Sequence, residues 1–435
     1  MPEETFTVKI EKLVQGGWGL ARVDGKVLLV RGAIPAETVA VTGGTAHKQY
    51  REAMVSQVLV PSPDRVAPPC PVYEACGGCQ LQHLRYEAQL AHKAAILKET
   101  LARVGKLTVE DVAPVVPSPT PYGYRSAVRF VVFREGRGFA LGFHEEGSHR
   151  PVAASCCLLV PDALREVIGT VNGRLAAQTR LPVRLESVEV RWSTSAGEVL
   201  LTWRIEPTGR SSAERLFDLF QDVPGVIGQV ATAQGGGRWV RGRDWITDRL
   251  ADLSFRISER SFMQANWVLN ATLSQTVGDW ALSGSSEGGE ARLRVLELHA
   301  GIGTLGLPLA RRGALVTLVD GNTHAVADAR HAAKINHVGR TRFRHARAEE
   351  LLVEVQPGDY DVIIVDPPRT GLSRECVREV LRLEVPRVLY LSCDPATLAR
   401  DLGWLTAGGY RLSRLQPFDM FPQTAHLETL VELAR

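Results

Sequence analysis

The stretch LELHAGIGTLGLPLA, residues 296–310, joins an apolar strand pattern, a glycine-rich loop and the start of a helical pattern. Gly301, Gly303 and Gly306 satisfy the spacing G-x-G-x-x-G, and Asp320 ends the next apolar stretch. Glycines in such a loop let the backbone approach a ligand closely, and the acid binds ribose hydroxyls. The pattern predicts a ribose-containing cofactor and fits a nicotinamide dinucleotide and S-adenosylmethionine equally well. A tight turn without a ligand is the structural alternative.

The surrounding sequence repeats the strand pattern at regular distances. The expected strands are RVLEL (294–298), LVTLV (315–319), DVIIV (361–365) and RVLYL (387–391), with helical patterns between them and a loop, GSSEGGEA (284–291), before the first. Such alternation predicts a doubly wound parallel sheet with helices on both faces. Ligands of such sheets bind at the carboxyl ends of the strands.

The rest of the chain has a different pattern. Residues 5–60 alternate in short segments separated by glycine turns, which predicts a small β-barrel, and PSPDRVAPPCP (61–71) resembles a linker. A helix is expected near 84–105, and strands dominate from 122 to about 250. A length of 435 residues suits roughly three domains of ~150 residues. We therefore expect domains at 1–62, 63–250 and 251–435.

Composition limits the class of protein. Hydrophobic residues make up 45% and charged residues 23%, as in globular proteins. Because no apolar stretch approaches ~18 residues, we expect no membrane span, and the start MPEETFTVKI lacks a signal-peptide pattern. A cytoplasmic location is therefore expected. A net charge of +3 is too small to indicate a nucleic-acid partner by itself.

The seven cysteines are unevenly spread. Three lie in CPVYEACGGC (70–79), and Cys156 and Cys157 are adjacent. In a reducing compartment such a cluster favours metal binding or catalysis over disulfides. The spacing Cys70-x5-Cys76-x2-Cys79 is typical of an iron–sulfur cluster or a zinc site, since thiolates serve both. A fourth ligand has to come from elsewhere in the chain.

Cys393 stands apart from that cluster. In LSCDPATLARDL (391–402) it follows an apolar strand and precedes a helical pattern, so it lies on the rim where ligands bind. A buried structural cysteine is the alternative. IVDPPRTG (364–371) gives a second strand that ends in a polar loop. HLETLVEL (426–433) places an acid, Glu428, within a third apolar strand.

Together these segments resemble the RNA uridine C5-methyltransferases, the RumA/TrmA-like family. The matching stretches are SFMQAN (261–266), the glycine loop, VDPPRTG, LSCDPATLARDL and FDMFPQTAHLETLVEL (418–433). Residues 12–39 are similar to a TRAM domain, a small RNA-binding barrel. CPVYEACGGCQLQH (70–83) resembles the iron–sulfur motif of the branch that acts on ribosomal RNA. The resemblance therefore implies an RNA substrate, with 23S rRNA favoured over tRNA.

The resemblance also implies a fold for each part of the chain. Residues 251–435 would form a class I S-adenosylmethionine-dependent methyltransferase domain with a Rossmann-like sheet. Residues 1–62 would form an OB-like TRAM barrel. Residues 63–250 would form a β-rich central domain with a 4Fe-4S cluster and an RNA-binding surface. A monomer without an obligate protein partner is expected.

The same resemblance assigns residues. It implies Cys393 as the nucleophile at uracil C6, Glu428 as the base that removes the C5 proton, and Asp366 as a contact to the uracil edge. The implied contacts to S-adenosylmethionine are Gln264, His299, Gly301, Gly303, Thr304, Asp320 and Asp366. The implied cluster ligands are Cys70, Cys76, Cys79 and Cys156. His299-Ala300 departs from the family, which usually has an aromatic residue followed by Cys or Ser.

Other functions remain to be compared with this one. The same reaction on tRNA is the first alternative. A nicotinamide-dependent oxidoreductase would use the glycine loop but would leave the cysteine cluster and HLETL unexplained. An amino-group methyltransferase would have an aromatic residue where Arg369 stands. A non-enzymatic RNA-binding iron–sulfur protein would need no Cys393. Arginines available for phosphate are Arg125, Arg129, Arg134, Arg137 and Arg150, with a second group at Arg238, Arg241 and Arg243.

Overall fold

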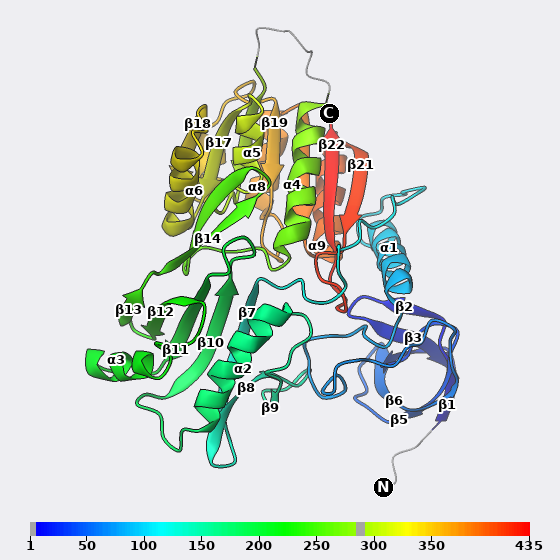
Figure 1. The fold of residues 1–435 in the computed structure, drawn as a ribbon. Helices are drawn as coiled ribbons and strands as arrows, with labels where there is room; N and C mark the ends of the chain where they lie inside the picture. Colours follow the sequence, from blue (N-terminus) through cyan, green and yellow to red (C-terminus); the bar gives the residue numbers. More distant parts are fainter. Residues whose placement is uncertain (1–5, 284–291) are drawn as a thin grey trace.

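The computed structural model of the chain describes residues 6–283 and 292–435, so the predicted loop at 284–291 lies outside the described residues. Three β-sheet units are arranged around a common centre, with the N-terminal unit and the central unit side by side beneath the C-terminal one (Figure 1). The segment around residues 105–125 and the segment between β21 and β22 pass through the region where the units meet (Figure 1).

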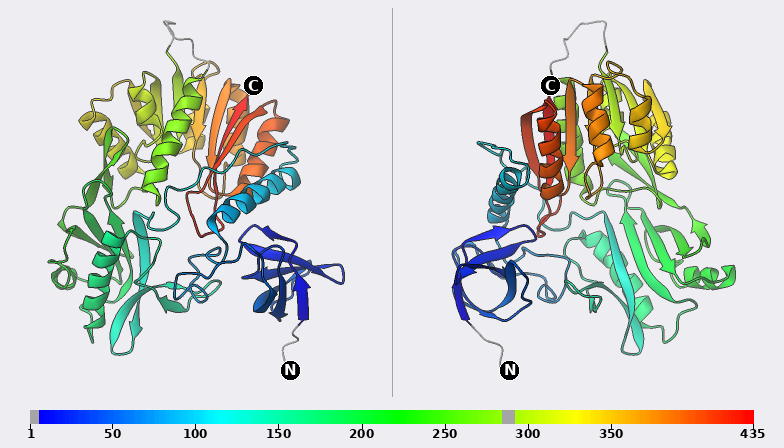
Figure 2. Two further views of the ribbon diagram at one scale, coloured as in Figure 1. Left: turned by 45° about the vertical axis from the view of Figure 1, so that its right-hand side comes forward. Right: turned by 180° about the vertical axis from the view of Figure 1, so that it is seen from behind.

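The N-terminal unit is a six-stranded, strongly curled sheet (Figure 2). Its strand order is β1-β5-β6-β4-β3-β2. The strands are β1 (Phe6–Lys9), β2 (Lys12–Val14), β3 (Trp18–Val23), β4 (Lys26–Arg31), β5 (Thr38–Thr42) and β6 (Tyr50–Val60). Alternate residues such as Val8, Val30 and Val39 point into one apolar core, which is why the sequence shows a period of two.

Helix α1 (Tyr86–Arg103) follows the cysteine-rich segment and packs against α9 (Pro395–Ala407) of the C-terminal unit. Leu97 and Leu101 are buried in the same apolar core as the C-terminal sheet. The helix therefore attaches the chain after the barrel to the C-terminal unit.

The central unit is a seven-stranded sheet with two helices on one face. Its order is β13-β12-β11-β10-β7-β8-β9. The elements are β7 (Ala127–Glu135), β8 (Gly138–His144), β9 (Pro151–Ala153), α2 (Asp162–Ala176), β10 (Leu185–Trp192), β11 (Val199–Ile205), α3 (Arg210–Asp218), β12 (Val226–Ala233) and β13 (Arg238–Gly242). Helix α2 buries Leu164, Ile168 and Val171 against this sheet.

A hairpin of β14 (Trp245–Leu250) and β15 (Leu253–Ser258) spans the boundary predicted at residue 250. Strand β15 packs against α6, which belongs to the C-terminal unit. Phe255 and Ile257 are buried in that unit's core. The hairpin therefore buries its apolar side chains with the C-terminal unit, while Ser193 and Thr194 of the central unit hydrogen-bond to β14. The domain boundaries remain a prediction.

The C-terminal unit is a doubly wound sheet with the order β18-β17-β16-β19-β20-β22-β21. Strands β16 to β20 pair in parallel, while β22 is antiparallel to both of its neighbours. This arrangement confirms the predicted class I methyltransferase fold. The strands are β16 (Arg294–Leu298), β17 (Leu315–Asp320), β18 (Thr341–His345), β19 (Val362–Val365), β20 (Arg387–Ser392), β21 (Arg411–Phe418) and β22 (Glu428–Ala434). Besides α9, the helices are α4 (Trp267–Leu282), α5 (Gly306–Arg311), α6 (Thr323–Ile335), α7 (Ala348–Glu354) and α8 (Arg374–Leu383).

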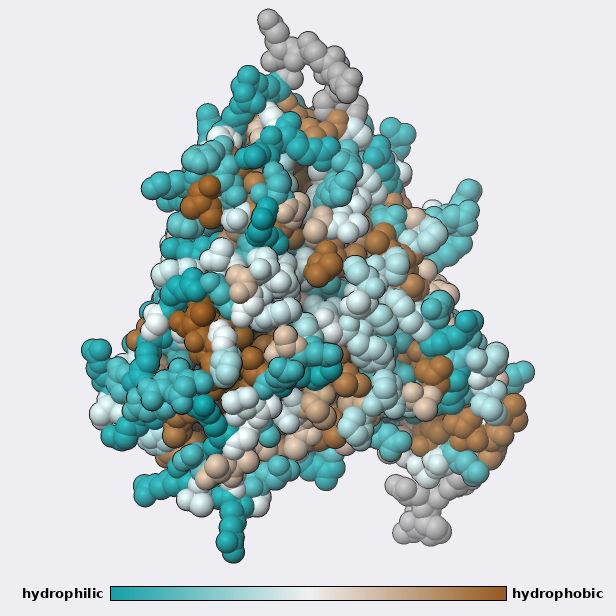
Figure 3. Space-filling view, in the orientation of Figure 1, coloured by the Kyte–Doolittle hydropathy of each residue, from teal (hydrophilic) through white to brown (hydrophobic). Residues whose placement is uncertain are grey.

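The apolar length of the helices and the hydropathy of the surface bear on the question of a membrane span. No helix within the described residues is long and apolar enough to cross a membrane. Hydrophilic side chains cover much of the face in Figure 3, and hydrophobic ones lie in separate small groups.

A buried ion pair joins α1 to the segment between β21 and β22. Lys93 Nζ lies 2.6 Å from Asp419 Oδ1, and the two side chains are 2% and 0% exposed. Lys93 also donates a hydrogen bond to the carbonyl of Phe421 at 3.2 Å. A charge that is removed from water needs its partner, because an unpaired buried charge is very costly.

We expect Lys93→Met to destabilise the protein by about 3–5 kcal/mol, because the Asp419 carboxylate would stay buried without its partner. The midpoint of urea unfolding measures this. Lys98→Met, at an exposed position of the same helix, is the control and should change the midpoint little. The double variant Lys93→Met/Asp419→Leu should recover most of the loss. A double variant as unstable as the single one would contradict this account.

Candidate active site

The predicted nucleophile lies at the carboxyl end of β20. Cys393 follows Ser392, the last residue of that strand, and precedes Asp394, the N-cap of α9. The Asp394 carboxylate accepts hydrogen bonds from the backbone N–H groups of Ala396 and Thr397, at 3.0 and 2.8 Å. This cap satisfies donors at the start of the helix. It holds Cys393, which is half-buried, in the bend between strand and helix.

Two carboxyl groups lie at the same edge of the sheet. Asp366 follows β19 and Glu428 begins β22, and these two strands flank β20. Ser392 pairs with Thr429 in the antiparallel ladder, so one further step places Cys393 opposite Glu428. Residues directly opposite in such a ladder have side chains on the same face. The structure thus brings the three catalytic candidates together from distant parts of the sequence.

Cys393, Glu428 and Asp366 all have raised pKa values, because burial and nearby negative charges disfavour their ionised forms. The pKa of the Cys393 thiol is raised to about 11, first by burial and then by the negative charge of Glu428, although Arg369 acts in the opposite direction. Burial, and then repulsion from Asp366, raises the pKa of Glu428 well above its ordinary range. Burial, and then repulsion from Asp320, raises the pKa of Asp366 to about 7. The cluster therefore retains protons near neutral pH.

Arg369 and His426 join two loops beside the cluster. The Arg369 Nη2 atom lies 3.0 Å from Nε2 of His426. Burial, and then the charge of Arg369, lowers the pKa of His426 to about 4. The imidazole is therefore neutral at pH 7 and can accept a hydrogen bond from the guanidinium. The Thr397 hydroxyl donates to the Arg369 carbonyl at 3.1 Å, which fixes this loop to α9.

The glycine loop has the geometry that its sequence predicts. Gly301 and Gly303 have φ of +54° and +86°, and a Cβ on Gly303 would lie 2.9 Å from the Leu307 side chain. The Asp320 carboxylate accepts backbone hydrogen bonds from Gly301 at 2.8 Å and from Asn322 at 2.7 Å. A carboxylate has about four lone-pair sites. Asp320 can therefore hold the loop and still accept bonds from ribose hydroxyls.

The other cofactor candidates surround this loop. His299 directly follows β16 and has φ of +58°, and its buried Nδ1 has no hydrogen-bond partner among the described residues. Burial lowers the pKa of His299, so its ring is neutral. The carbonyl of Thr304 accepts a hydrogen bond from Ser274 of α4 at 2.7 Å. Gln264 is partly buried in the segment that leads into α4.

Glu297, inside β16, is a candidate that the sequence analysis missed. Its side chain is 2% exposed, and Oε2 has no hydrogen-bond partner in the described part of the chain. A Cβ on Gly306 would lie 2.1 Å from this oxygen, so the carboxyl lies against the start of α5. Burial, followed by repulsion from Asp366 and Asp320, raises the pKa of Glu297 well above its usual range. An acid in the middle of an apolar strand was the available signal.

Four cysteines line one small cavity, of about 70 Å³, between the cysteine-rich segment and the central sheet. They are Cys70, Cys76, Cys79 and Cys157. Cys156, which the resemblance implied as the fourth ligand, is exposed and does not line this cavity. Burial raises the pKa of Cys79 to about 12, and that of Cys157 as well. Within residues 6–283 and 292–435, no three His, Cys, Asp or Glu side chains form a group that could hold a metal ion.

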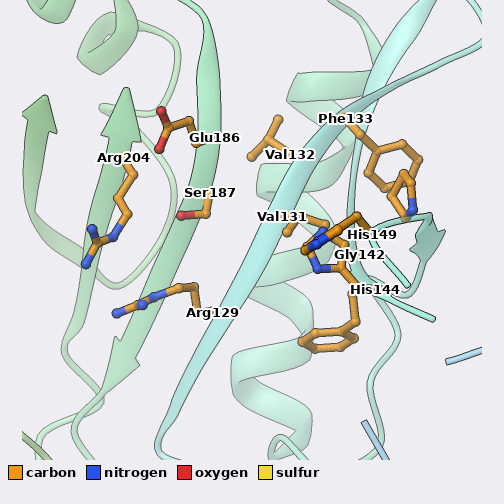
Figure 4. Close-up of a pocket in the computed structure, with 12 residues that line it drawn as sticks. Arg129, Val131, Val132, Phe133, Gly142, His144, His149, Glu186, Ser187 and Arg204 are labelled. Atoms are coloured by element: carbon orange, nitrogen blue, oxygen red, sulfur yellow. The ribbon is translucent and has the colours of Figure 1, made fainter. Parts of the chain in front are cut away.

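The arginines expected to contact RNA fall into two kinds. Arg238, Arg241 and Arg243 all form ion pairs with nearby carboxylates, so much of their charge is already compensated. Arg129 also pairs with Glu189, but together with Arg204, which the sequence analysis did not single out, it lines a hollow of about 670 Å³ on the central sheet (Figure 4). His144 and His149 lie on the other side of this hollow (Figure 4).

The hollow continues toward the C-terminal unit. Arg129 and Arg204 also line a second hollow of about 420 Å³, whose other walls include Arg260, Phe262 and Asn322. Phe262 is 67% exposed, although it is a large apolar side chain. Phe262 and Asn322 are two residues from the cofactor candidates Gln264 and Asp320. The two hollows lie next to each other, because Arg129 and Arg204 line both, and we refer to them together as the groove.

Known proteins are similar to this chain over most of its length. Residues 85–435 match the family model described as tRNA (uracil-5-)-methyltransferase. An uncharacterized RNA methyltransferase of Gloeobacter violaceus is 35% identical, over 99% of this chain and 97% of its own length. One from Aquifex aeolicus is 34% identical, over 100% of this chain and 99% of its own length.

A solved structure matches the whole chain as well. It is the Pyrococcus abyssi tRNA (uracil-54, C5)-methyltransferase in complex with S-adenosyl-L-homocysteine, with 27% identity and a TM-score of 0.76. The match covers 98% of this chain and 99% of that one. The chain belongs to the tRNA (uracil-5-)-methyltransferase family and is an S-adenosylmethionine-dependent RNA uracil-C5 methyltransferase.

Proposed function

We propose that this enzyme methylates uracil C5 through a covalent bond between Cys393 and uracil C6. The observation that carries the proposal is the position of Cys393, between Asp366 and Glu428 at the carboxyl edge of the sheet. S-adenosylmethionine would supply the methyl group, and Gln264 and His299 would hold it beside the glycine loop. Uracil C5 is a poor nucleophile by itself, so the cysteine has a specific task.

The Cys393 sulfur adds to C6 of the ring as its proton passes to solvent. The electron pair of the C5–C6 double bond moves toward O4, and Asp366 supports the resulting enolate through the uracil edge. C5 is now nucleophilic and would take the methyl group, whose bond to the sulfonium sulfur breaks so that S-adenosylhomocysteine is left. Because burial and Glu428 raise the pKa of the thiol to about 11, the free site holds Cys393 mostly as the thiol at neutral pH.

Glu428 completes the reaction. Its carboxylate removes the proton from the methylated C5, and the electron pair of that C–H bond forms the C5–C6 double bond again. The bond between C6 and the Cys393 sulfur breaks in the same step, which releases the thiolate. The raised pKa of Glu428 makes its carboxylate a stronger base than an exposed glutamate once its own proton has left.

The RNA substrate is proposed from two different observations. The cysteine-rich motif and the N-terminal barrel resemble the branch that acts on ribosomal RNA, which favours 23S rRNA. The similarity to a Pyrococcus abyssi tRNA methyltransferase along the whole chain favours tRNA as the second candidate. The groove through Arg129, Arg204 and Phe262 offers cations for phosphates and an exposed ring for an unpaired base. A single-stranded or loop region therefore suits it.

We also propose that the cysteine-lined cavity holds a 4Fe-4S cluster, with zinc as the alternative. The kind of donor supports the proposal, because four cysteines line one cavity and no Asp or Glu among the described residues does. Their side chains are not gathered closely enough to form a metal-holding group in this structure, so cluster binding would have to draw them together. In this proposal Cys157 replaces Cys156 as the fourth ligand, because Cys157 lines the cavity and Cys156 does not. Methyl transfer needs no electron donor, so the cluster's role would be structural.

We expect Cys393→Ala to abolish methylation of both rRNA and tRNA transcripts while S-adenosylhomocysteine still binds, because only the covalent step needs this sulfur. Methyl transfer to matched 23S rRNA and tRNA transcripts, with wild-type enzyme alongside, measures this and identifies the preferred substrate. Cys376→Ala, at a buried cysteine of α8, is the control and should remain active. Turnover by Cys393→Ala near the wild-type rate would remove this residue from the mechanism.

Glu428→Gln should stop the reaction after methyl transfer, with resolution of the adduct slowed by about 10²–10⁴-fold, as expected for loss of a general base. A protein–RNA adduct that survives denaturing electrophoresis should accumulate. Glu432→Gln is the control, since Glu432 lies on the same strand but pairs with Arg387 and Arg414. Normal turnover of Glu428→Gln without an adduct would require another base.

Protein purified without oxygen should contain about four iron and four sulfide per chain, as a 4Fe-4S cluster requires. Cys157→Ser should lose this iron because it removes a thiol from the cavity, and Cys156→Ser should retain it. Metal and sulfide analysis of the two variants checks both statements. Zinc without iron in the wild-type protein would contradict the cluster. The opposite behaviour of the two variants would return the fourth ligand to Cys156.

A further inference from the structure

The segment between β21 and β22, residues 419–427, is irregular but largely buried. It carries His426 and leads directly into Glu428. Buried backbone groups need hydrogen-bond partners, and this segment has no sheet or helix of its own to provide them. Its path therefore depends on side chains and backbone groups from other parts of the chain.

Gln423 is the point at which most of these partners meet. It is 3% exposed and has φ of +68°, a conformation that residues other than glycine rarely adopt. Its carbonyl accepts backbone hydrogen bonds from Gln80 and Leu81, both at 3.0 Å. Such a conformation persists only where the surroundings fix it, and it is common near active sites.

The side chain of Gln423 forms a closed pair with Gln89 of α1. The backbone N–H of Gln423 donates to Gln89 Oε1 at 3.1 Å, and Gln89 Nε2 donates to Gln423 Oε1 at 2.9 Å. Gln89 is fully buried, with Nε2 also donating to the carbonyls of Leu81 and Leu84. Loss of the Gln423 side chain would leave buried polar atoms of Gln89 without one of their partners.

The neighbours of Gln423 are tied to the same surroundings. Gln80, which follows Cys79, accepts a hydrogen bond from the backbone of Ala425 at 3.3 Å. The hydroxyl of Tyr124 donates to the carbonyl of Pro422 at 3.0 Å. The barrel also approaches this point, since a Cβ on Gly17 would lie 3.5 Å from Ala425. The cysteine-rich segment, α1, the entry to the central sheet and the barrel thus all contact residues 422–425.

We propose that Gln423 is a positioning residue, which fixes the path of residues 419–427 and so aims the Glu428 carboxylate at the C5 proton. The inference rests on the role proposed for Glu428. Gln423 touches neither RNA nor S-adenosylmethionine in this scheme, and it acts only through the backbone that leads to Glu428. Because Gln80 and Gln89 are the partners of Gln423, the direction of the Glu428 carboxylate depends on the cysteine-rich segment and on α1.

Gln423→Gly is the sharpest test, because glycine adopts the left-handed conformation without strain and removes only the side-chain bonds. We expect the first methyl transfer to proceed and the resolution of the adduct to slow by roughly ten- to a hundredfold, since a displacement of about 1 Å at a reacting group has an effect of that size. The KM for RNA and the affinity for S-adenosylhomocysteine should not change. Release of tritium from 5-tritiated uridine in RNA measures removal of the C5 proton directly.

Two further variants separate positioning from folding. Gln89→Ala should slow adduct resolution at least as much, because it removes both bonds of the pair whereas Gln423→Gly keeps the backbone one. The double variant should be no slower than Gln89→Ala alone. Gln356→Leu, at an exposed glutamine between α7 and β19, is the control and should behave as wild type.

The outcomes distinguish this inference from the proposed mechanism. If Glu428→Gln accumulates adduct and Gln423→Gly releases tritium at the wild-type rate, the positioning role is wrong and the mechanism stands. If Gln423→Gly raises the KM for RNA with normal tritium release, the segment binds RNA and the positioning role is again wrong. If Glu428→Gln itself turns over normally, the role proposed for Glu428 is wrong.

Discussion

The structure depends on one constraint. Residues 419–427, between the last two strands, are buried and irregular, so their backbone N–H and C=O groups need hydrogen-bond partners from elsewhere in the chain. Lys93 and Gln89 of α1, Gln80 of the cysteine-rich segment and Tyr124 at the entry to the central sheet all supply its hydrogen bonds. These partners come from parts of the chain that pack into different cores. The segment is therefore the place where the three units are held in one arrangement, and it is also the segment that leads to the proposed base.

A second constraint is electrostatic. Asp320, Asp366, Glu428 and Glu297 crowd the carboxyl edge of one sheet, and burial, together with repulsion from nearby carboxylates in this group, raises the pKa of Asp366, Glu428 and Glu297. An edge with this many acids holds protons that a solvent-exposed surface would release. Arg369 offsets part of this charge beside Cys393. Such an edge can bind a cationic sulfonium and can also exchange protons with a bound base ring.

The sequence predicted the fold well where a local pattern is sufficient. The strands around the glycine loop and the strand before Cys393 lie where the sequence has apolar runs. This is expected, because parallel strands that are buried on both faces are continuously apolar. Which of Cys156 and Cys157 lines the cysteine-lined cavity was not predictable in this way, and the fourth ligand remains a proposal. Cys156 and Cys157 are adjacent, and only the bend after β9 decides that Cys157 lines the cavity. Gln423 was missed for a similar reason, since hydrogen bonds with distant segments give it its importance. Glu297 was missed although an acid within an apolar strand was a local signal.

The pairing of β20 with β22 carries a consequence for how this site can change. Cys393 and Glu428 lie opposite each other only because Ser392 pairs with Thr429. A shift of one residue in this register would turn Glu428 to the other face of the sheet. The distance between the proposed nucleophile and the proposed base is therefore set by the spacing of the backbone ladder and not by side-chain packing alone. An insertion or deletion within either strand would disconnect the two groups at once, whereas a substitution elsewhere in the core could only displace them gradually.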